Sequence, residues 1–262
     1  MDTRAFASKT LNPADLNDPA VRPRADQLRR FAWKLAIANV PFAVNGVLRR
    51  RFLVRPHKTW EYARGLACVL AKRDARASRR REPRAEGGRD RRKFRVLDFG
   101  GAATLPVFYL AQLGCEVWCL DVDPTLVNWT NQTAWKRNWT LRALTDDLTA
   151  APAPPEWGRF DAVVSFSVLE HLARPAQAVA VQRLAGLVKP QGVLALTFDY
   201  GKDAPQPNAL RNETEVHRLI AASGMKPMHG DFTDSGQRFA LDKRHPRRLF
   251  TFASLFLKKS GE

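Results

Sequence analysis

Acidic side chains recur where apolar runs of this sequence end. Asp98 follows the run FRVL, Asp121 follows VWCL, and the pair Asp146-Asp147 follows a shorter and weaker run. A carboxylate can accept hydrogen bonds from two hydroxyl groups at once, so Asp121 has the chemistry needed to hold a ribose diol. Asp98 stands directly before a glycine turn, where a carboxylate suits a cationic amino group better than a pyrophosphate. The spacing therefore predicts a site for a nucleoside-containing ligand.

Small residues follow Asp98 in the order Gly100, Gly101, Ala102 and Ala103. They let the backbone approach a ligand closely, and the amides of a turn and a helix start favour an anionic group. The second and third glycines of the dinucleotide-binding pattern GxGxxG are absent. A nicotinamide cofactor is therefore the least favoured interpretation.

The elements that position these residues alternate along residues 94–262. Buried strands are expected at 94–99, 114–120, 160–167, 192–198 and 248–259, with a weak strand before Asp146. Helices are expected at 104–113, 124–137, 175–188 and 213–223. Alternating strands and helices predict an α/β fold with an open, mostly parallel sheet and helices on both faces. Ligands of such sheets collect at the carboxyl ends of the strands.

The N-terminal third has a different pattern. We expect an irregular leader over 1–26, helix from 27 to about 53 with an interruption at Pro41, and a helix over 59–72. Large apolar residues are almost absent from 73–93, which indicates a flexible linker. The predicted organisation is a helical lid or extension over 1–72, a basic linker over 73–93 and a ligand-binding domain over 94–262.

Positive charge is concentrated in the same third. The chain has 262 residues, with 43 Lys and Arg against 26 Asp and Glu, for a net charge of +17. Residues 1–95 hold 25 basic and 9 acidic residues, whereas residues 96–262 hold 18 and 17. A basic surface favours nucleic acid, anionic lipid or phosphorylated substrates, although coding bias toward arginine would also produce it. With 45% hydrophobic residues, wholesale disorder is excluded.

Cysteine and histidine usage excludes other classes. Three cysteines without a CxxC pair do not form a disulfide framework, and scattered histidines without ligand spacing offer no metal site. No secretion signal is recognisable, and the most apolar N-terminal stretch, 31–48, is broken by polar residues and a proline. These features predict a cytoplasmic protein. Arginines on both sides of 31–48 leave open a peripheral position on an anionic membrane.

Four segments together resemble the class I S-adenosylmethionine-dependent methyltransferases, in particular the small standalone methyltransferase domains. They are VLDFGGAAT, VWCLDVDP, FDAVVSFSVLEHL and LVKPQGVLALTFDY, and the resemblance runs from about residue 94 to 257. The order and spacing of all four are specific, whereas a single one is not. Ala102 and Thr104 stand where the family often has glycine. The resemblance implies a Rossmann-like, seven-stranded sheet and S-adenosyl-L-methionine as cofactor.

The resemblance also implies roles for individual residues around that cofactor. The methionine end would be held by the glycine turn and the acid before it, and the ribose and adenine by the ends of the second and third strands. The sulfonium end would be closed by a residue of the strand at 160–167 and the turn that follows it. In that order the implied residues are Asp98, Gly100, Gly101 and Ala102; Asp121, Val122, Asp147 and the alternative Asp146; and Ser165.

The methyl acceptor would lie near residues that follow the last two motif strands. A hydroxyl acceptor usually needs a general base, whereas an amine needs only its free lone pair. His171 is the best candidate base, with Asp199 and Tyr200 shaping the acceptor pocket; the alternative is that His171 caps or packs a helix start. The N-terminal helices are expected to form a lid, to which Trp33, Trp60 and Tyr62 could contribute or merely pack.

The function predicted from the sequence is methyl transfer from S-adenosyl-L-methionine, mainly to oxygen of a small-molecule or saccharide acceptor. The alternatives are an RNA methyltransferase and a non-catalytic cofactor-binding scaffold protein. RNA ranks lower because no aromatic-and-basic module for RNA is present. The basic N-terminal region would serve a phosphorylated substrate or an anionic membrane surface.

Overall fold

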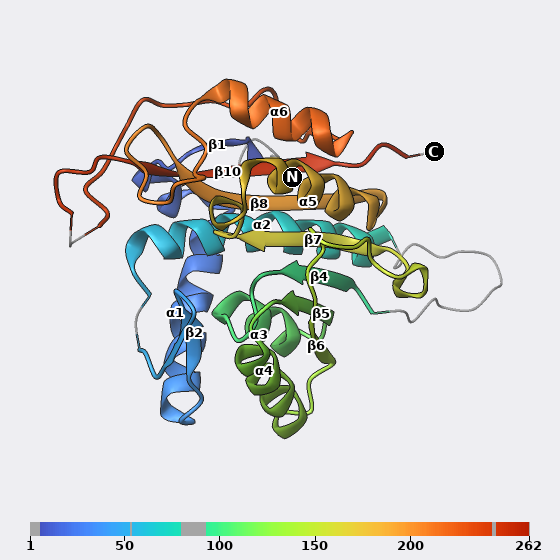
Figure 1. Ribbon diagram of the computed structural model, residues 1–262. Helices are drawn as coiled ribbons and strands as arrows, with labels where there is room; N and C mark the ends of the chain where they lie inside the picture. The colour runs from blue at the N-terminus through green and yellow to red at the C-terminus, as the bar shows by residue number, and fades with distance from the viewer. Residues whose placement is uncertain (1–5, 53, 80–92, 243–244, 262) are drawn as a thin grey trace.

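A twisted sheet forms the centre of the molecule (Figure 1). The computed structural model describes residues 6–52, 54–79, 93–242 and 245–261. The strand order is β1-β10-β8-β7-β4-β5-β6, with β9 also paired to β10. The strands are β1 (Lys9–Thr10), β4 (Arg95–Phe99), β5 (Glu116–Asp121), β6 (Leu141–Thr145), β7 (Phe160–Phe166), β8 (Val188–Tyr200), β9 (Lys226–Pro227) and β10 (Thr251–Lys258). Strands β8, β7, β4, β5 and β6 are parallel and β10 is antiparallel, which confirms the predicted mostly parallel sheet.

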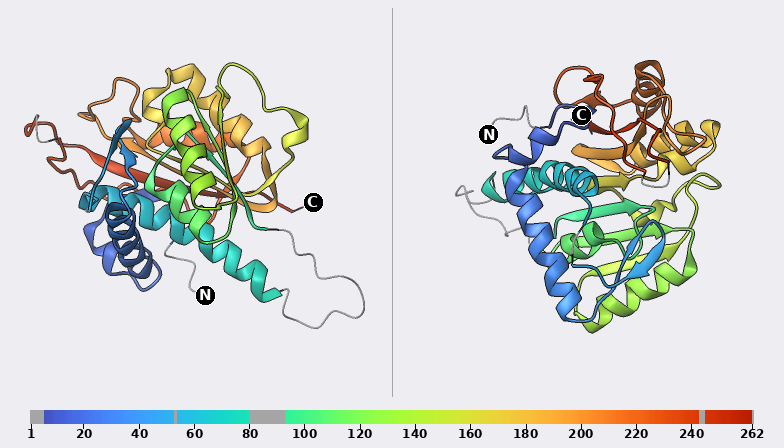
Figure 2. Two further views of the ribbon diagram at one scale, coloured as in Figure 1. Left: turned by 90° about the horizontal axis from the view of Figure 1, so that it is seen from below. Right: turned by 90° about the vertical axis from the view of Figure 1, so that its left-hand side faces the viewer.

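Helices cover both faces of the sheet (Figures 1 and 2). They are α1 (Arg22–Ile37), α2 (Pro56–Arg79), α3 (Leu105–Gln112), α4 (Pro124–Lys136), α5 (Arg174–Gly186) and α6 (Glu213–Ser223). Successive strand residues face opposite sides, so Val96 joins the core under α1–α4 and Leu97 joins the core under α5 and α6. The predicted arrangement of helices on both faces is confirmed.

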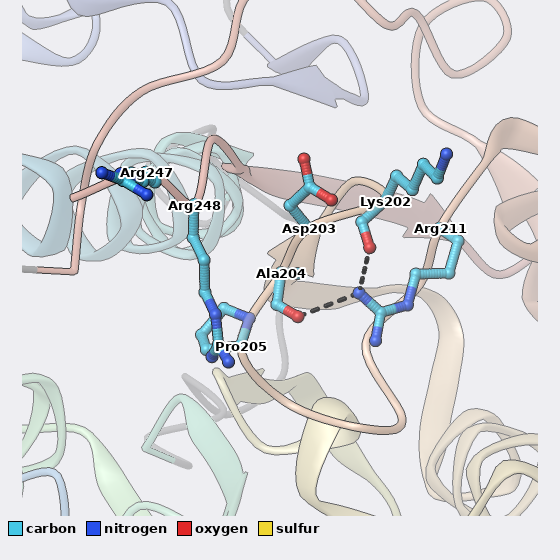
Figure 3. A pocket seen from close by; sticks show the side chains of 7 residues that line it. All are labelled: Lys202, Asp203, Ala204, Pro205, Arg211, Arg247 and Arg248. Atoms are coloured by element: carbon cyan, nitrogen blue, oxygen red, sulfur yellow. Dashed lines mark hydrogen bonds between the residues drawn. The ribbon is translucent and has the colours of Figure 1, made fainter. Parts of the chain in front are cut away.

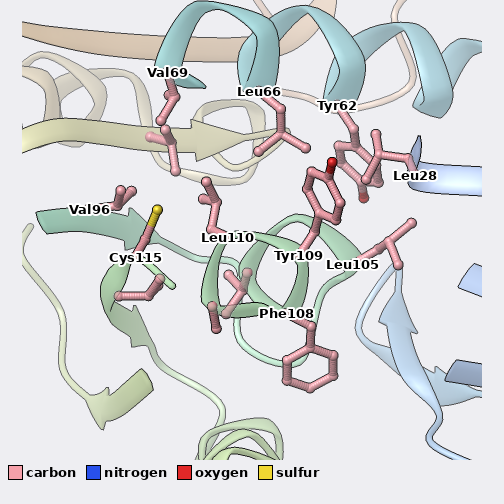
Figure 4. Close-up of a cluster of buried hydrophobic side chains, with 14 of the residues drawn as sticks. Leu28, Tyr62, Leu66, Val69, Val96, Leu105, Phe108, Tyr109, Leu110 and Cys115 are labelled. Atoms are coloured by element: carbon pink, nitrogen blue, oxygen red, sulfur yellow. The ribbon is translucent and has the colours of Figure 1, made fainter. Parts of the chain in front are cut away.

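The larger core is built where α2 crosses the sheet beside α3 (Figure 4). Leu66 and Val69 of α2 are fully buried with Leu105 and Leu110 of α3. Local signals set the helix limits as expected: Asp123 caps the start of α4 by accepting hydrogen bonds from the amides of the first turn. Because these helices are anchored through apolar contacts, the loops at their N-terminal ends are held over the strand ends.

The segment after α1 is a β-hairpin and not the expected helix. Strands β2 (Phe42–Val44) and β3 (Val47–Arg49) pair antiparallel across Asn45 and Gly46, whose φ angles are 51° and 72°. Two consecutive residues with positive φ make a type I′ turn, for which Asn-Gly is the preferred pair. The prediction of helix to about residue 53 was therefore wrong beyond Ile37, and the Asn-Gly pair was the signal for the hairpin.

The N-terminal segment is more ordered than the predicted leader. Strand β1 pairs with β10, and Phe6 and Leu11 are buried. Helix α2 continues to Arg79, beyond the boundary predicted at residue 72, where Arg76 forms an ion pair with Asp161 at 2.7 Å. The remainder of the predicted basic linker, 80–92, lies outside the described residues. Within the described ranges, no helix has the length and apolar character needed to cross a bilayer.

Candidate active site

A cavity of about 770 Å³ lies at the carboxyl ends of β4, β5, β7 and β8. The β2–β3 hairpin and the start of α2 form its other wall. Eight of the predicted site residues line it: Gly100, Ala102, Asp121, Val122, Asp146, Asp147, His171 and Asp199. The volume suits a cofactor together with a small acceptor, since ligand pockets typically measure about 300–1,000 Å³.

The glycine turn after β4 is shaped by two close approaches. Gly100 has φ +81°, and a Cβ at this position would lie 2.6 Å from a methyl group of Val168. A Cβ on Gly101 would overlap the carboxylate of Asp98. Asp98 is thus buried beneath the loop and does not line the cavity. Burial, aided by the charge of Asp121, raises the pKa of Asp98 to about 8. Asp98 supports the loop from below.

Asp121 joins the end of β5 to the same turn. Its Oδ2 accepts a hydrogen bond from the Ala102 amide at 3.0 Å, and its Oδ1 accepts one from the Asp123 amide at 3.0 Å. Val122 projects into the opening of the cavity and is 67% exposed. A carboxylate and an exposed apolar side chain therefore stand side by side, as a ribose and a base would require.

The pair Asp146-Asp147 follows β6, and a backbone hydrogen bond links it to Asp121 at the end of β5. The Asp146 amide donates to the carbonyl of Asp121 at 3.1 Å. Asp147 Oδ1 accepts hydrogen bonds from both the amide and the hydroxyl of Thr149, which orients its carboxylate. Both side chains line the cavity beside Val122, so the structure leaves open which of them meets the ligand.

Besides Asp98 and Gly101, two more predicted site residues, Ser165 and Tyr200, do not line the cavity. The Ser165 hydroxyl is buried and donates to the Phe99 carbonyl at 2.9 Å, which holds the ends of β7 and β4 together. Ser167, with φ 54°, lines the cavity in its place. Tyr200 was expected in the acceptor pocket, but its ring packs 5.5 Å from Phe232. Neighbouring residues of a strand face opposite sides, so Asp199 points to the cavity and Tyr200 away from it.

Sequence reasoning missed a buried polar cluster between α2 and the strand ends. Lys58 Nζ lies 2.9 Å from Glu61 Oε2 and donates to Ser167 Oγ at 2.6 Å. Glu61 Oε1 accepts the hydroxyls of Ser167 at 2.7 Å and Thr197 at 2.6 Å. Burial alone would lower the pKa of Lys58, but the Glu61 carboxylate raises it above its usual value. This cluster fixes the start of α2 over the ends of β7 and β8.

Glu170 and Asp199 form a second missed feature, a carboxyl pair at the acceptor end of the cavity. The Asp199 amide donates to Glu170 Oε1 at 3.3 Å, whereas Glu170 Oε2 is buried and has no hydrogen-bond partner among the described residues. Burial raises the pKa of both groups, and the charge of Asp199 raises that of Glu170 further. Burial and the neighbouring charge therefore both favour the protonated forms of these carboxyl groups.

Two histidines flank this pair. His171, in the short 3-10 helix Leu169–His171, is exposed at the cavity wall. Partial burial of its ring and the charge of Lys58 lower its pKa, so the imidazole is neutral near pH 7. His57 stacks on Phe252 with ring centroids 5.2 Å apart, and burial lowers its pKa to about 4. Neutral imidazoles can accept a proton, which makes His171 competent as a base.

A second, shallower depression of about 480 Å³ adjoins the cavity (Figure 3). Arg211 shapes it by donating to the carbonyls of Lys202 at 2.7 Å and Ala204 at 2.9 Å. Arg247 and Arg248 line its other side, and Pro205 lines both the depression and the cavity. Basic side chains therefore stand next to the acceptor end.

Comparisons with known proteins agree with this geometry. Residues 97–196 match the family model described as "Methyltransferase domain". No curated protein sequence matches the chain. Among solved structures, TehB from Haemophilus influenzae is 20% identical with a TM-score of 0.51, over 63% of this chain and 57% of that one. The match therefore spans less than two thirds of TehB.

Other solved structures match over nearly the whole chain. The [4+2]-cyclase SpnF is 15% identical with a TM-score of 0.56, over 93% of both chains. Magnesium protoporphyrin IX methyltransferase (ChlM) from Synechocystis PCC 6803, crystallised with bound SAM, is 16% identical with a TM-score of 0.50, over 90% of this chain and 97% of that one. At these identities the likeness shows the shared fold.

The fold and the site define a Rossmann-like protein that binds a nucleoside-containing cofactor at its strand ends. The family match covers residues 97–196, a methyltransferase domain whose implied cofactor is S-adenosyl-L-methionine. The residues present fit that group. Gly100 lets the backbone of the turn line the cavity with Val168 packed against it, and Asp121 and Val122 offer a diol acceptor beside an apolar contact.

Proposed function

We propose that this protein is a class I S-adenosylmethionine-dependent methyltransferase that acts on a hydroxyl oxygen of a small-molecule or saccharide acceptor. The proposal rests on the Glu170–Asp199 pair, whose unpartnered Glu170 Oε2 and cavity-facing Asp199 lie at the acceptor end. A hydroxyl nucleophile has a proton to lose, whereas a free amine attacks through its lone pair. A buried carboxyl pair with spare accepting capacity therefore favours oxygen over nitrogen.

In the proposed site, the chain holds the cofactor through the residues at the ends of β4 to β6. Gly100 and Ala102 would receive the methionine end, with Asp98 and Gly101 supporting the loop from beneath. Asp121 would accept the ribose hydroxyls, Val122 would pack on adenine, and Asp147 or Asp146 would meet its amino group. When bound, the cofactor supplies an activated methyl group on a sulfonium. Ser167 and Val168 would close this end of the cavity.

The acceptor would lie between the carboxyl pair and His171. Alignment of the reactants accounts for much of the barrier reduction in a displacement of this kind, about 7–11 kcal/mol in the best model systems. Asp199 and His171 both line the cavity, and either can accept the hydroxyl proton as the new C–O bond forms. Lys58, held by Glu61, keeps the pair partly ionised.

Calorimetry with S-adenosylhomocysteine tests the cofactor site. We expect Asp121→Ala to weaken binding of S-adenosylhomocysteine by about tenfold or more. The variant would lose the two proposed hydrogen bonds from the ribose hydroxyls to the Asp121 carboxylate. The exposed Asp231→Ala variant is the control and should bind like the wild type. Unchanged affinity of Asp121→Ala would show that Asp121 does not hold the ribose.

An acceptor screen with labelled S-adenosyl-L-methionine tests the reaction. With a responsive hydroxyl acceptor, Asp199→Asn should lower kcat by about a hundredfold if the carboxyl pair is the base, and His171→Gln should do so if the imidazole is. Transfer to amines alone would contradict oxygen as the acceptor atom. Transfer only to RNA would identify an RNA methyltransferase, and cofactor binding without transfer to any class would indicate a scaffold protein.

A further inference from the structure

A basic and aromatic surface, called the α1–hairpin patch below, lies on α1, on β3 and on the three residues that follow β3. Its apolar members are Trp33, Ile37, Val47 and Phe52, which are 49%, 74%, 48% and 40% exposed. Its basic members are Arg29, Arg30, Lys34, Arg49 and Arg50. Exposed large apolar groups in such a cluster indicate an interaction surface.

A ring contact joins the helical part of the patch to the segment after β3. Arg29, Trp33 and Ile37 are four residues apart on α1 and share one exposed stripe, since the buried stripe runs through Leu28, Phe31, Ala32 and Leu35. The Trp33 and Phe52 rings meet edge to face with centroids 4.9 Å apart. On β3, Val47 and Arg49 face outward while Leu48 between them is partly buried. Figure 2 (right) shows α1 along one side of the molecule with the hairpin beside it.

The charge of this surface is almost purely positive. Residues 22–55 contain nine Lys or Arg and one acidic residue, Asp26. Asp26 pairs with Arg29 at 3.1 Å. In the part of the chain that the structure describes, Arg30, Lys34, Arg49 and Arg50 have no ion-pair partner. Their charges are therefore available to an anionic partner.

We propose that the α1–hairpin patch docks this enzyme on an anionic phospholipid surface. Tryptophan and phenylalanine side chains insert at the boundary between headgroups and acyl chains, and neighbouring Lys and Arg attract anionic headgroups. Ile37, an aliphatic side chain at the end of α1, gains from lipid but offers RNA no stacking surface. A second copy of this chain would bring like charges together, which disfavours self-association.

The docking places the cavity mouth next to the lipid surface. Ala43, Val44, Asn45 and Gly46 of the hairpin line the cavity, as do Arg51 and Arg55 on the segment that follows it. The hairpin therefore belongs both to the proposed docking surface and to the cavity wall. The proposal concerns lipid binding alone and stands whether or not the acceptor is a hydroxyl compound.

Vesicle sedimentation with the full chain tests this proposal. The probes are phosphatidylcholine vesicles and vesicles of equimolar phosphatidylcholine and phosphatidylglycerol. We expect binding only to the anionic vesicles, with the partition coefficient falling about tenfold or more in Trp33→Ser/Phe52→Ser and in Arg49→Gln/Arg50→Gln. Ile37→Ser, a single change at a helix end, should lower it severalfold and guards against misfolding of the double variants. Leu249→Ser, at a site 48% exposed on the loop before β10, is the control and should bind like the wild type.

Three results would overturn the proposal. The first is equal binding of wild type and all three patch variants to anionic vesicles. The second is loss of single-stranded RNA binding in the patch variants while vesicle binding is retained, which would assign the surface to nucleic acid. The third is a wild-type dimer in size-exclusion chromatography that becomes monomeric in Trp33→Ser/Phe52→Ser, which would assign it to a second copy.

Discussion

Three aspartates at the strand ends meet different surroundings, and their surroundings decide what each can do. Asp98 is sealed under the glycine turn, Asp121 receives two backbone amides at the cavity wall, and Asp199 shares a buried corner with Glu170. Burial favours the neutral carboxyl group, whereas amide donors favour the carboxylate. The same type of side chain therefore supports the loop at Asp98, and in the proposed function it accepts ribose hydroxyls at Asp121 and a proton at Asp199.

Asp98 predicts a pH dependence of stability. Its pKa is about 8 in the folded protein and about 3.9 in an unfolded chain. The folded state thus binds the proton more tightly, so this contribution is complete below about pH 4 and is lost as the pH rises to about 8. In thermal unfolding, Asp98→Asn should gain stability relative to wild type as the pH increases across that window. The exposed Asp231→Asn variant is the control; a pH-independent difference for Asp98→Asn would contradict the assignment.

Cavity-lining residues at the ends of β5 and β6 could be predicted from the sequence because each follows its own strand. Asp121 and Asp147 needed only the strand pattern and the resemblance. Lys58 and Glu61 could not be found in this way, because Glu61 meets Ser167 and Thr197 across 106 and 136 residues. Glu170 stands beside His171 in the sequence, but its pairing with Asp199 depends on how β8 packs against the segment after β7. No local sequence pattern predicts that packing.

At the scale of elements, the contact between α2 and β7 sets one wall of the cavity. Gly65 faces Phe166, the last residue of β7, and a Cβ at Gly65 would overlap the Phe166 ring. Phe166 lines the cavity and its ring lies 6.1 Å from that of Tyr62. The close approach of α2 to β7 therefore depends on glycine at position 65.

We expect Gly65→Ala to push Phe166 toward the cavity. Overpacking of this kind typically costs about 1–3 kcal/mol, offset in part by the better helix propensity of alanine. Urea unfolding should show the loss of stability, and S-adenosylhomocysteine affinity should fall as well. Gly186→Ala at the end of α5 is the matched control, since no atom lies within 4 Å of its added Cβ. Wild-type stability and affinity in Gly65→Ala would contradict this prediction, because they would show that the Phe166 ring moves aside without cost.

Helices were predicted correctly where the apolar periodicity and the capping residues agreed. The prediction failed where a tight turn determined the structure. Helix α6 was predicted over the residues that it occupies, because Asn212 caps its start and Gly224, with φ 61°, ends it. The hairpin was missed because apolar residues from Phe42 to Leu48 fit a helix as well as two short strands. Residues 73–79 were expected to be flexible, but polar contacts such as Arg76 with Asp161 hold them in helix.

At the scale of the whole molecule, one buried acid connects the N-terminal segment to the methyltransferase fold. Asp15 accepts a hydrogen bond from Trp60 Nε1 at 2.9 Å and pairs with Arg64 at 3.4 Å and Lys9 at 2.6 Å. Arg64 also donates to the carbonyl of Ala7 at 2.6 Å. Segments before α1, the helix α2 and the sheet edge are thereby joined, and the predicted extension packs as part of one body.

Removing this acid should destabilise the whole protein. Asp15→Ala leaves the buried Arg64 without its counter-charge, a change that typically costs about 3–5 kcal/mol. Asp15→Asn keeps an acceptor for Trp60 and should cost less. Chemical denaturation measures both, with Asp26→Asn on α1 as a control that breaks only the exposed pair with Arg29. Equal stability of Asp15→Ala and wild type would show that the segment is not coupled to the fold.

The pairing of β1 with β10 also has a consequence for the order of folding. The Lys9 carbonyl accepts the Ser254 hydroxyl across 245 residues. Closing so long a loop costs only about 2 kcal/mol more than closing one of roughly 20 residues, so equilibrium stability suffers little. The folding rate is affected more, because the partners of β1 in the described chain, β10 and Thr233, both lie far along the sequence. Attachment of β1 therefore marks the completion of the sheet, and its hydrogen exchange would be the last to slow during refolding.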